Sequence, residues 1–269
     1  MVNKTLNQDW ITPLWPAPKN VRAVSTTRQL AEPATSLYAN GYANGYANFN
    51  LATHVGDDAS SVQNNRAILR NTLNLPNEPV WLNQVHGTDI VYLRDTSSGD
   101  AATMLTTPPA ADATISQTQQ AVAVVMTADC LPVLLCDQAG TVVAAVHAGW
   151  RGLVNGVLQA TVQGMNVPAE QLLAWLGPGI GAAVYEVGED VRQTFCAADP
   201  AYAAMFKVSP ARPTHYLLDM VGAARLALQS VGVYQLYGGE YCTYQESQRF
   251  YSYRRDGVTG RMASLIWLS

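Results

Sequence analysis

The chain has 269 residues, of which 48% are hydrophobic and 13% are charged, a balance typical of a compact globular protein. Its formal net charge is −4 and only three of its 16 basic residues are lysines, so no basic tract exists that could bind a nucleic acid backbone. The longest apolar run, residues 121–126, is too short to cross a bilayer. We therefore predict a cytoplasmic protein that binds neither nucleic acid nor membrane.

The four cysteines form no C-x-x-C pair and are too few for a disulfide scaffold in a chain of this length. We expect reduced thiols, so a cysteine with a special role is a ligand or a nucleophile. No Ser/Gly-rich or charged linker divides the chain. We therefore predict a single domain that spans residues 1–269.

Near the amino terminus, residues 38–48 repeat Tyr-Ala-Asn-Gly almost three times. This tract is too short for a solenoid and too rich in Gly and Asn for a strand. We predict a surface loop with aromatic residues over residues 29–49.

Helix signals follow in three segments. The first is residues 57–73, where acidic residues supply caps at the start of an apolar stripe. The second is opened by Gly152 and carries apolar residues four apart through Val162, and the third follows Asp219 and ends near Gly232.

Six short runs are apolar or rich in β-branched residues and are bounded by turn residues. They are residues 121–126, 131–136, 141–147, 172–176, 233–237 and 263–267. Several are apolar at consecutive positions, which indicates burial on both faces. Since strands outnumber helices without strict alternation, we predict an α+β fold, a single domain with mixed β-sheets flanked by helices.

Two of the four histidines and one cysteine lie at or near the ends of predicted strands. His147 ends residues 141–147, Cys130 follows residues 121–126, and His86 lies between two apolar pairs. A His/Cys/His set with a vacant fourth position suits catalytic zinc. Alternatively, Cys130 is a core thiol and both histidines are hydrogen-bonded neighbours. Four histidines are too few for the several copper centres of a laccase.

Charged residues near these positions have two interpretations each. Asp129 beside Cys130 needs a cation, a metal or water nearby, or it caps a turn. Arg151 at a predicted helix start suits a phosphate or another anion, or it forms a surface ion pair. Residues 249–261, which include Arg254, form either the rim of a site for a planar or anionic ligand or a solvated hairpin.

Residues 177–182 fit the pattern G-x-G-x-x-A, but a dinucleotide site requires a helix directly afterwards. Residues 183–188 alternate like a strand instead. We therefore predict a tight turn that lines a cleft.

Six groups of residues form longer motifs in a fixed order. They are Asn83-Gln84-Val85-His86-Gly87, Ala111-Asp112-Ala113, Thr127-Ala128-Asp129-Cys130-Leu131-Pro132, His147-Ala148-Gly149-Trp150-Arg151-Gly152, Gly177-Pro178 with Tyr185-Glu186-Val187-Gly188, and Ser252-Tyr253-Arg254-Arg255-Asp256 through Gly260-Arg261-Met262-Ala263-Ser264. Together they resemble the YfiH/YlmD family, formerly DUF152, whose members are labelled polyphenol oxidase or laccase-domain proteins. The match runs from about Trp15 to the last residue, and residues 29–49 depart from the family pattern.

The resemblance implies a single-domain fold with mixed sheets and one zinc ion held by His86, Cys130 and His147. It also implies phosphorolysis of adenosine, inosine and methylthioadenosine to free base and ribose 1-phosphate, together with deamination of adenosine. Purine nucleosides and phosphate are then the small-molecule partners. A copper-dependent polyphenol oxidoreductase is the older interpretation of this family.

We expect Arg151 or Arg254 to hold phosphate during phosphorolysis. During deamination, Asp129 is the candidate proton shuttle. A second hypothesis makes Cys130 the nucleophile of a cysteine hydrolase, with His147 or His86 as its base. A third makes zinc a structural staple in a binding module without enzymatic activity.

Overall fold

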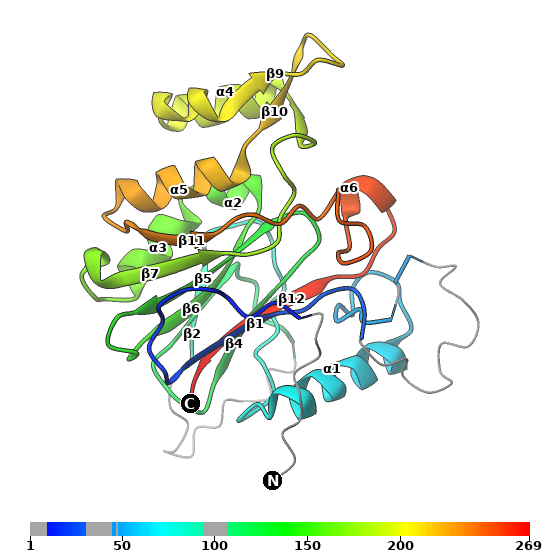
Figure 1. The fold of residues 1–269 in the computed structure, drawn as a ribbon, viewed down its shortest axis with the longest axis vertical. Helices are drawn as coiled ribbons and strands as arrows, with labels where there is room; N and C mark the ends of the chain where they lie inside the picture. Colours follow the sequence, from blue (N-terminus) through cyan, green and yellow to red (C-terminus); the bar gives the residue numbers. More distant parts are fainter. Residues whose placement is uncertain (1–9, 31–44, 47, 94–106) are drawn as a thin grey trace.

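The computed structural model describes residues 10–30, 45–46, 48–93 and 107–269. Two β-sheets packed against each other form its centre (Figure 1). Within the described residues the larger sheet has the strand order β11-β7-β5-β6-β3-β2, and the smaller sheet has the order β1-β12-β4. The larger sheet comprises β2 (Ile90–Leu93), β3 (Ala113–Ser116), β5 (Leu131–Asp137), β6 (Val143–Ala148), β7 (Leu172–Leu176) and β11 (Gln235–Gly238). The smaller sheet comprises β1 (Val21–Ser25), β4 (Val122–Thr127) and β12 (Met262–Leu268).

Every residue of β4, β5, β6, β7 and β12 is buried. These strands are apolar at consecutive positions, so both of their faces can be buried, and each central strand lies between two apolar layers. Val125 and Ile266 of the smaller sheet meet Leu134 and Ala145 of the larger sheet in one core cluster between the sheets. The prediction of burial on both faces is confirmed.

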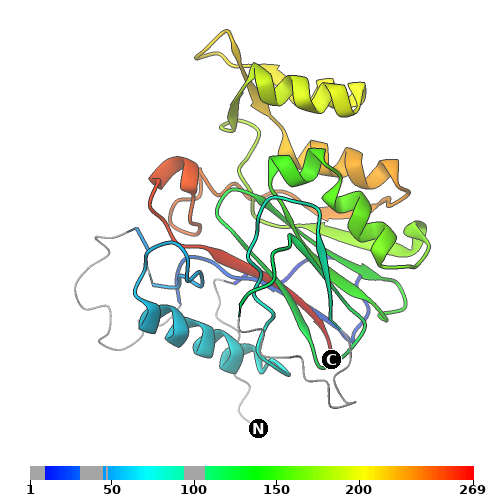
Figure 2. The ribbon, with the colours of Figure 1, turned by 180° about the vertical axis from the view of Figure 1, so that it is seen from behind.

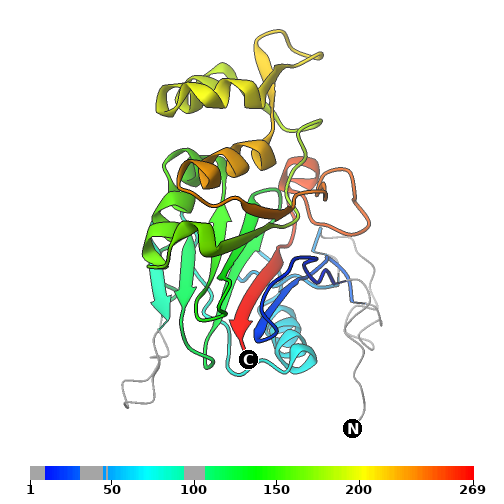
Figure 3. The same cartoon turned by 60° about the vertical axis from the view of Figure 1, so that its left-hand side comes forward.

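Helices cover the outer faces of both sheets, as Figures 2 and 3 show from two further directions. The larger sheet is covered by α2 (Trp150–Val154), α3 (Val157–Gly164) and α5 (Met220–Ser230). The smaller sheet is covered by α1 (Ala59–Leu73), whose Leu69 and Leu73 pack against Val124. Asp58 caps α1 by accepting a hydrogen bond from the Ser61 N–H at 2.8 Å.

A small lobe extends beyond α5 at one end of the molecule (Figure 1). It contains β8 (Glu186–Gly188), α4 (Glu189–Ala198), the 3₁₀ segment η2 (Pro200–Met205), β9 (Phe206–Val208) and β10 (His215–Leu218). The lobe is held by edge-to-face packing of Phe195 against Tyr202 and Phe206. A second 3₁₀ turn, η1 (Ala169–Gln171), precedes β7, and α6 (Tyr253–Asp256) precedes β12.

The predicted fold class is confirmed: the fold is α+β, and the larger sheet is mixed, whereas the smaller sheet is antiparallel. The β5–β6 pair is antiparallel, while β2–β3 and β7–β11 are parallel. All six predicted strands and the first and third predicted helices are present, with ends that differ by a few residues. No helix within the described ranges is both long and apolar enough for a transmembrane span.

The second predicted helix is wrong in two respects. It begins at Trp150, before Gly152, and it breaks into α2 and α3. The break occurs because Gly156 adopts φ +93°, which interrupts the helical backbone. Most of the loop predicted at residues 29–49 lies outside the described residues.

Candidate metal centre

The register of the larger sheet brings three side chains together at one of its ends. The β5–β6 pairing aligns Leu131 with Ala148, so Cys130, just before β5, lies beside the end of β6 that holds His147. His86 lies in the loop that leads into β2, at the same end of the sheet. These residues are distant in sequence, and their proximity depends on strand pairing.

One potential ligand atom from each of His86, Cys130 and His147 lies within 4.8 Å of the other two. The Cys130 Sγ is 3.7 Å from His86 Nε2, and the two imidazole rings meet edge to face with centroids 4.8 Å apart. His147 is buried, Cys130 is partly buried and His86 is exposed. The cluster is therefore open to solvent on the His86 side.

Asp112 connects two of these three residues, and the sequence analysis assigned it no role. Its buried carboxylate accepts a hydrogen bond from His147 Nδ1 at 2.7 Å. It also accepts hydrogen bonds from the backbone N–H groups of Val85, His86 and Gly87 at 3.2, 3.0 and 2.6 Å. The Asp112 contact leaves Nε2 of His147 available to a metal or to the thiol.

Electrostatics favour charge separation within the cluster. Burial opposes ionisation of the Cys130 thiol, but the charges and hydrogen bonds of His147 and His86 outweigh it and lower the pKa to about 6. Burial also opposes protonation of His147, but the Cys130 thiolate and Asp112 raise its pKa to about 9. For Asp112, burial is again outweighed, here by hydrogen bonds from His147 and the loop, and its pKa is lowered. The cluster therefore favours a thiolate at neutral pH.

Gly149 makes the close approach of these side chains possible. A Cβ atom at this position would lie 2.5 Å from His86 Cδ2 and 3.2 Å from Cys130 Sγ. His86 itself has φ +61° and Asp129 has φ +91°, which are uncommon values for residues other than glycine. The backbone on both sides of the cluster is thus held in unusual conformations by its surroundings.

The structure places Asp129 beside the cluster with both carboxylate oxygens in use. Oδ1 accepts a hydrogen bond from Thr243 Oγ1 at 2.7 Å, and Oδ2 accepts one from the Arg254 backbone N–H at 2.6 Å. The second contact supplements the cap that Ser252 provides to α6. In this arrangement Asp129 positions α6 relative to Cys130, and proton transfer by Asp129 would require one of these bonds to open.

Arg254 stacks on Tyr185. The Arg254 guanidinium lies 5.0 Å from the centre of the Tyr185 ring and donates a hydrogen bond to the Glu186 carbonyl at 2.6 Å. Burial and the Cys130 charge raise the pKa of Tyr185 to about 12, while the charges of Arg254 and Arg151 oppose the rise. The Tyr185 ring therefore packs against one of the two arginines that the sequence suggested for anion binding.

The Arg151 guanidinium lies over the Trp150 ring at 4.4 Å and is exposed. Among the described residues it forms no ion pair, so the predicted surface ion pair is not present there. The predicted solvated hairpin over residues 249–261 is also absent, because Ser252 caps a helical turn there. Residues 177–182 run irregularly, with a bend at Pro178 and a β-bridge between Gly179 and Cys242, and the turn itself follows at residues 182–184. The Ile180 N–H donates a hydrogen bond to the Asp129 carbonyl at 2.8 Å.

Comparisons with known proteins agree over nearly the whole chain. A family model described as multi-copper polyphenol oxidoreductase laccase matches residues 34–269. The purine nucleoside phosphorylase YfiH of Escherichia coli (strain K12) is 47% identical over 258 residues, which cover 96% of this chain and 98% of that relative. The purine nucleoside phosphorylase PA4543 of Pseudomonas aeruginosa is 44% identical over 259 residues, with 96% and 98% coverage.

Two solved structures share the fold. Protein NMB0706 of Neisseria meningitidis, described by the family model DUF152, has a TM-score of 0.83 and 45% identity, and the match covers 97% of this chain and 100% of that one. YlmD from Geobacillus stearothermophilus has a TM-score of 0.78 and 28% identity, with 93% and 92% coverage. The similarity therefore extends over the whole architecture.

Proposed function

Because the chain belongs to the family of the multi-copper polyphenol oxidoreductase laccase model, together with YfiH and YlmD proteins, we propose that it is a purine nucleoside phosphorylase. Its centre is the cluster of His86, Cys130 and His147, and the resident metal is zinc. The observation that carries this proposal is the convergence of these three donors within 4.8 Å, in a chain 47% identical to a relative named purine nucleoside phosphorylase.

The donor set fits zinc on chemical grounds. Catalytic zinc commonly has three protein ligands drawn from imidazole nitrogen, thiolate sulfur and carboxylate oxygen, with the fourth position free. Tetrahedral bonds of about 2.0–2.3 Å place ligand atoms roughly 3.3–3.8 Å apart, and the Cys130 Sγ to His86 Nε2 separation is 3.7 Å. The hydrogen bond between Asp112 and His147 is the outer-shell contact that a metal-binding histidine usually makes.

Copper in several centres fits less well. All four histidines lie in the described residues, and only two of them belong to the cluster. Among the described residues, this is also the only group of three or more potential ligands whose donor atoms lie close together. A laccase needs further imidazoles for its other coppers.

In phosphorolysis, a phosphate oxygen forms a bond to C1′ of the ribose while the bond from C1′ to the purine nitrogen breaks. The purine leaves with the bonding electrons and takes up a proton, and ribose 1-phosphate is the second product. Zinc supplies Lewis acidity to this site when it is bound. Arg151 and Arg254 supply the positive charge that holds phosphate near the cluster.

The proposal is tested by incubating the protein with adenosine, inosine or methylthioadenosine, with and without phosphate, and separating the products by chromatography. We expect base and ribose 1-phosphate in equal amounts, and only when phosphate is present. Cys130→Ala should lower the rate at least a hundredfold, whereas Cys196→Ala in α4 should not change it. Base release that does not depend on phosphate would contradict phosphorolysis.

We further propose that the same centre deaminates adenosine, because the cluster is open on the His86 side to a substrate carbon. In this reaction a water oxygen bonds the purine carbon that carries the amine, the bond from this carbon to the amine nitrogen breaks, and inosine and ammonia are released without consumption of phosphate. Inosine formation in phosphate-free buffer that is lost in Cys130→Ala supports this second activity. Adenosine that stays unchanged without phosphate excludes it.

One observation favours the alternative of a cysteine hydrolase. Asp112, His147 and Cys130 lie in the order of a carboxylate, a base and a nucleophile, and the thiol pKa is about 6. His86 distinguishes the two functions, because a hydrolase needs one imidazole base and this cluster holds two imidazoles near the sulfur. Activity of metal-free protein on amide substrates would favour the hydrolase.

A further inference from the structure

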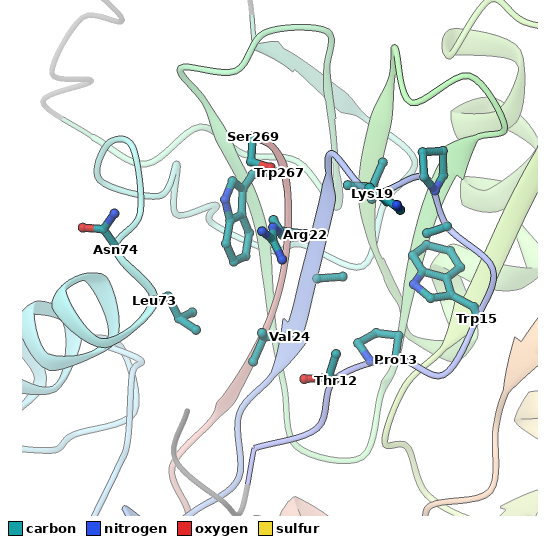
Figure 4. Close-up of a pocket in the computed structure, with 14 residues that line it drawn as sticks. Thr12, Pro13, Trp15, Lys19, Arg22, Val24, Leu73, Asn74, Trp267 and Ser269 are labelled. Carbon is teal, nitrogen blue, oxygen red and sulfur yellow. The ribbon is translucent and has the colours of Figure 1, made fainter. Parts of the chain in front are cut away.

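A cavity of about 690 Å³ lies along the edge strand β1, outside the metal centre. It extends from the end of α1, at Leu73 and Asn74, past β1 to Trp15 (Figure 4). Trp267 and Arg22 are directly opposite each other in the β1–β12 pairing. In Figure 4 their side chains lie next to each other, and Trp15 lies on the other side of β1.

The residues that line this cavity carry positive charge without a compensating carboxylate side chain. Lys19 and Arg22 are both exposed, and no aspartate or glutamate lines the cavity. Among the residues with described positions, neither cation has an ion pair or a side-chain hydrogen bond. The partly exposed Trp15 indole adds a flat apolar surface to the same cavity, whereas Trp267 is buried in the core beneath it. An exposed guanidinium suits an anionic group, and a neighbouring indole suits a flat ring. The cavity therefore fits a ligand that carries both.

We propose that this cavity is a second ligand site and binds a nucleoside monophosphate. The phosphate bonds Arg22 and Lys19, and the base stacks on the Trp15 indole. The cavity volume lies in the range of about 300–1,000 Å³ that is usual for small-molecule sites, which is more than a free phosphate ion needs. The proposal does not depend on the reaction at the metal centre.

The site is separate from the metal centre because strand β12 lies between them. Trp267 is near one end of β12, and Met262 at the other end pairs with Thr127, three residues before Cys130. Five residues of extended strand correspond to about 17 Å. A nucleotide in the cavity therefore does not reach the His/Cys/His cluster.

The test is isothermal titration calorimetry with adenosine monophosphate, on the wild-type protein and on Arg22→Gln. We expect Arg22→Gln to weaken binding about tenfold or more, because a charge-assisted hydrogen bond is lost. The matched control is Arg70→Gln, which removes the same charge from α1 outside the cavity lining and should bind as the wild type does. Cys130→Ala should also retain binding.

Adenosine and inorganic phosphate are titrated separately to resolve the two parts of the ligand. The proposal requires that each binds more weakly than adenosine monophosphate. It is overturned if adenosine monophosphate does not bind, if Arg22→Gln binds it as tightly as Arg70→Gln does, or if Cys130→Ala abolishes binding, which would place the nucleotide in the metal centre. If phosphate alone binds as tightly as the nucleotide, stacking of the base on an indole contributes nothing to binding, and the proposal is overturned.

Discussion

The Asp112 carboxylate and His147 Nδ1 lie 2.7 Å apart in a buried hydrogen bond. The β3–β6 register produces this contact, because it pairs Ala113 with Val146 and thereby places Asp112 next to His147. The same carboxylate binds three backbone N–H groups of the His86 loop. One buried side chain therefore fixes two of the three candidate metal ligands.

We predict that Asp112→Asn lowers zinc affinity about 10- to 100-fold, the usual cost of losing an outer-shell partner. An amide group still offers one acceptor oxygen to His147, but its NH₂ group then faces backbone donors of the loop. Competition with a coloured chelator measures the affinity. Asp137→Asn, which alters a buried carboxylate outside the cluster, is the control and should bind zinc as the wild type does. Equal affinity in both variants would show that Asp112 does not support the metal.

Much of the fold could be predicted from the sequence, because the central strands are apolar at consecutive positions and a two-sided core selects such runs. Cys130 and His147 could be placed at strand ends on the same grounds. The contact of His86 with these residues depends on strand order, which no local pattern specifies. Asp112 had a weak signal, as a single carboxylate directly before the short buried strand β3.

Other features could not be predicted because they depend on tertiary contacts. The helix break at Gly156 needs a positive φ that a glycine permits but does not require. The four residues of α6 show no apolar periodicity and none of them is buried, and this helical turn forms against Asp129, which lies 125 positions from Arg254 in the chain. Tertiary hydrogen bonds thus determined the structure where local propensity was weak.

Gly149→Ala should lower nucleoside turnover at least tenfold, because the added Cβ would lie 2.5 Å from His86 Cδ2 and push this ring away. The Gly149 backbone has φ −68°, so alanine causes no backbone strain there. The melting temperature should therefore change little. Gly188→Ala is the control, since its Cβ comes closest to the movable side chain of Asp190. A fully active Gly149→Ala variant would contradict the cluster geometry described above.

The stacking of Arg254 on Tyr185 predicts a selective effect on phosphate. Tyr185→Leu removes the ring under the guanidinium, and a cation–π contact at an accessible site is worth about 0.5–1 kcal/mol. We expect KM for phosphate to rise about two- to fivefold, with kcat nearly unchanged. Tyr185→Phe keeps the ring and should retain the wild-type KM. Steady-state kinetics with phosphate as the varied substrate measures both, and a phenylalanine variant as impaired as the leucine variant would assign the effect to the hydroxyl.

Asp137 predicts how stability depends on pH. Burial alone would raise its pKa, but hydrogen bonds from Val142 and Thr141 at 2.7–2.9 Å outweigh it, so the pKa is lowered. A lowered pKa stabilises the fold above the unfolded-state value of about 3.9, and this contribution is lost as the pH falls through the folded-state value. Asp137→Asn should thus be less stable by about 1–3 kcal/mol at pH 7, with a smaller difference below about pH 4.

Urea unfolding of wild type and Asp137→Asn between pH 7 and pH 3 measures this difference. Glu170→Gln, at an exposed position, removes the same charge and should show no such pH dependence. A difference between wild type and Asp137→Asn that stays constant down to pH 3 would contradict the role of the ionised carboxylate.

Alkylation of Cys130 separates a metal ligand from a catalytic nucleophile. In metal-free protein the thiol should react with iodoacetamide at a rate that rises with pH and levels off above a midpoint near 6, because the thiolate is the reactive form and its pKa is about 6. Zinc at pH 7.5 should slow this reaction strongly, since a coordinated sulfur is no longer free to attack. The Cys196→Ala background removes a thiol that is also partly exposed, while Cys136 and Cys242 are buried. If zinc gives no protection, and if metal-free protein hydrolyses amides until it is alkylated, Cys130 is a nucleophile and the phosphorylase proposal fails.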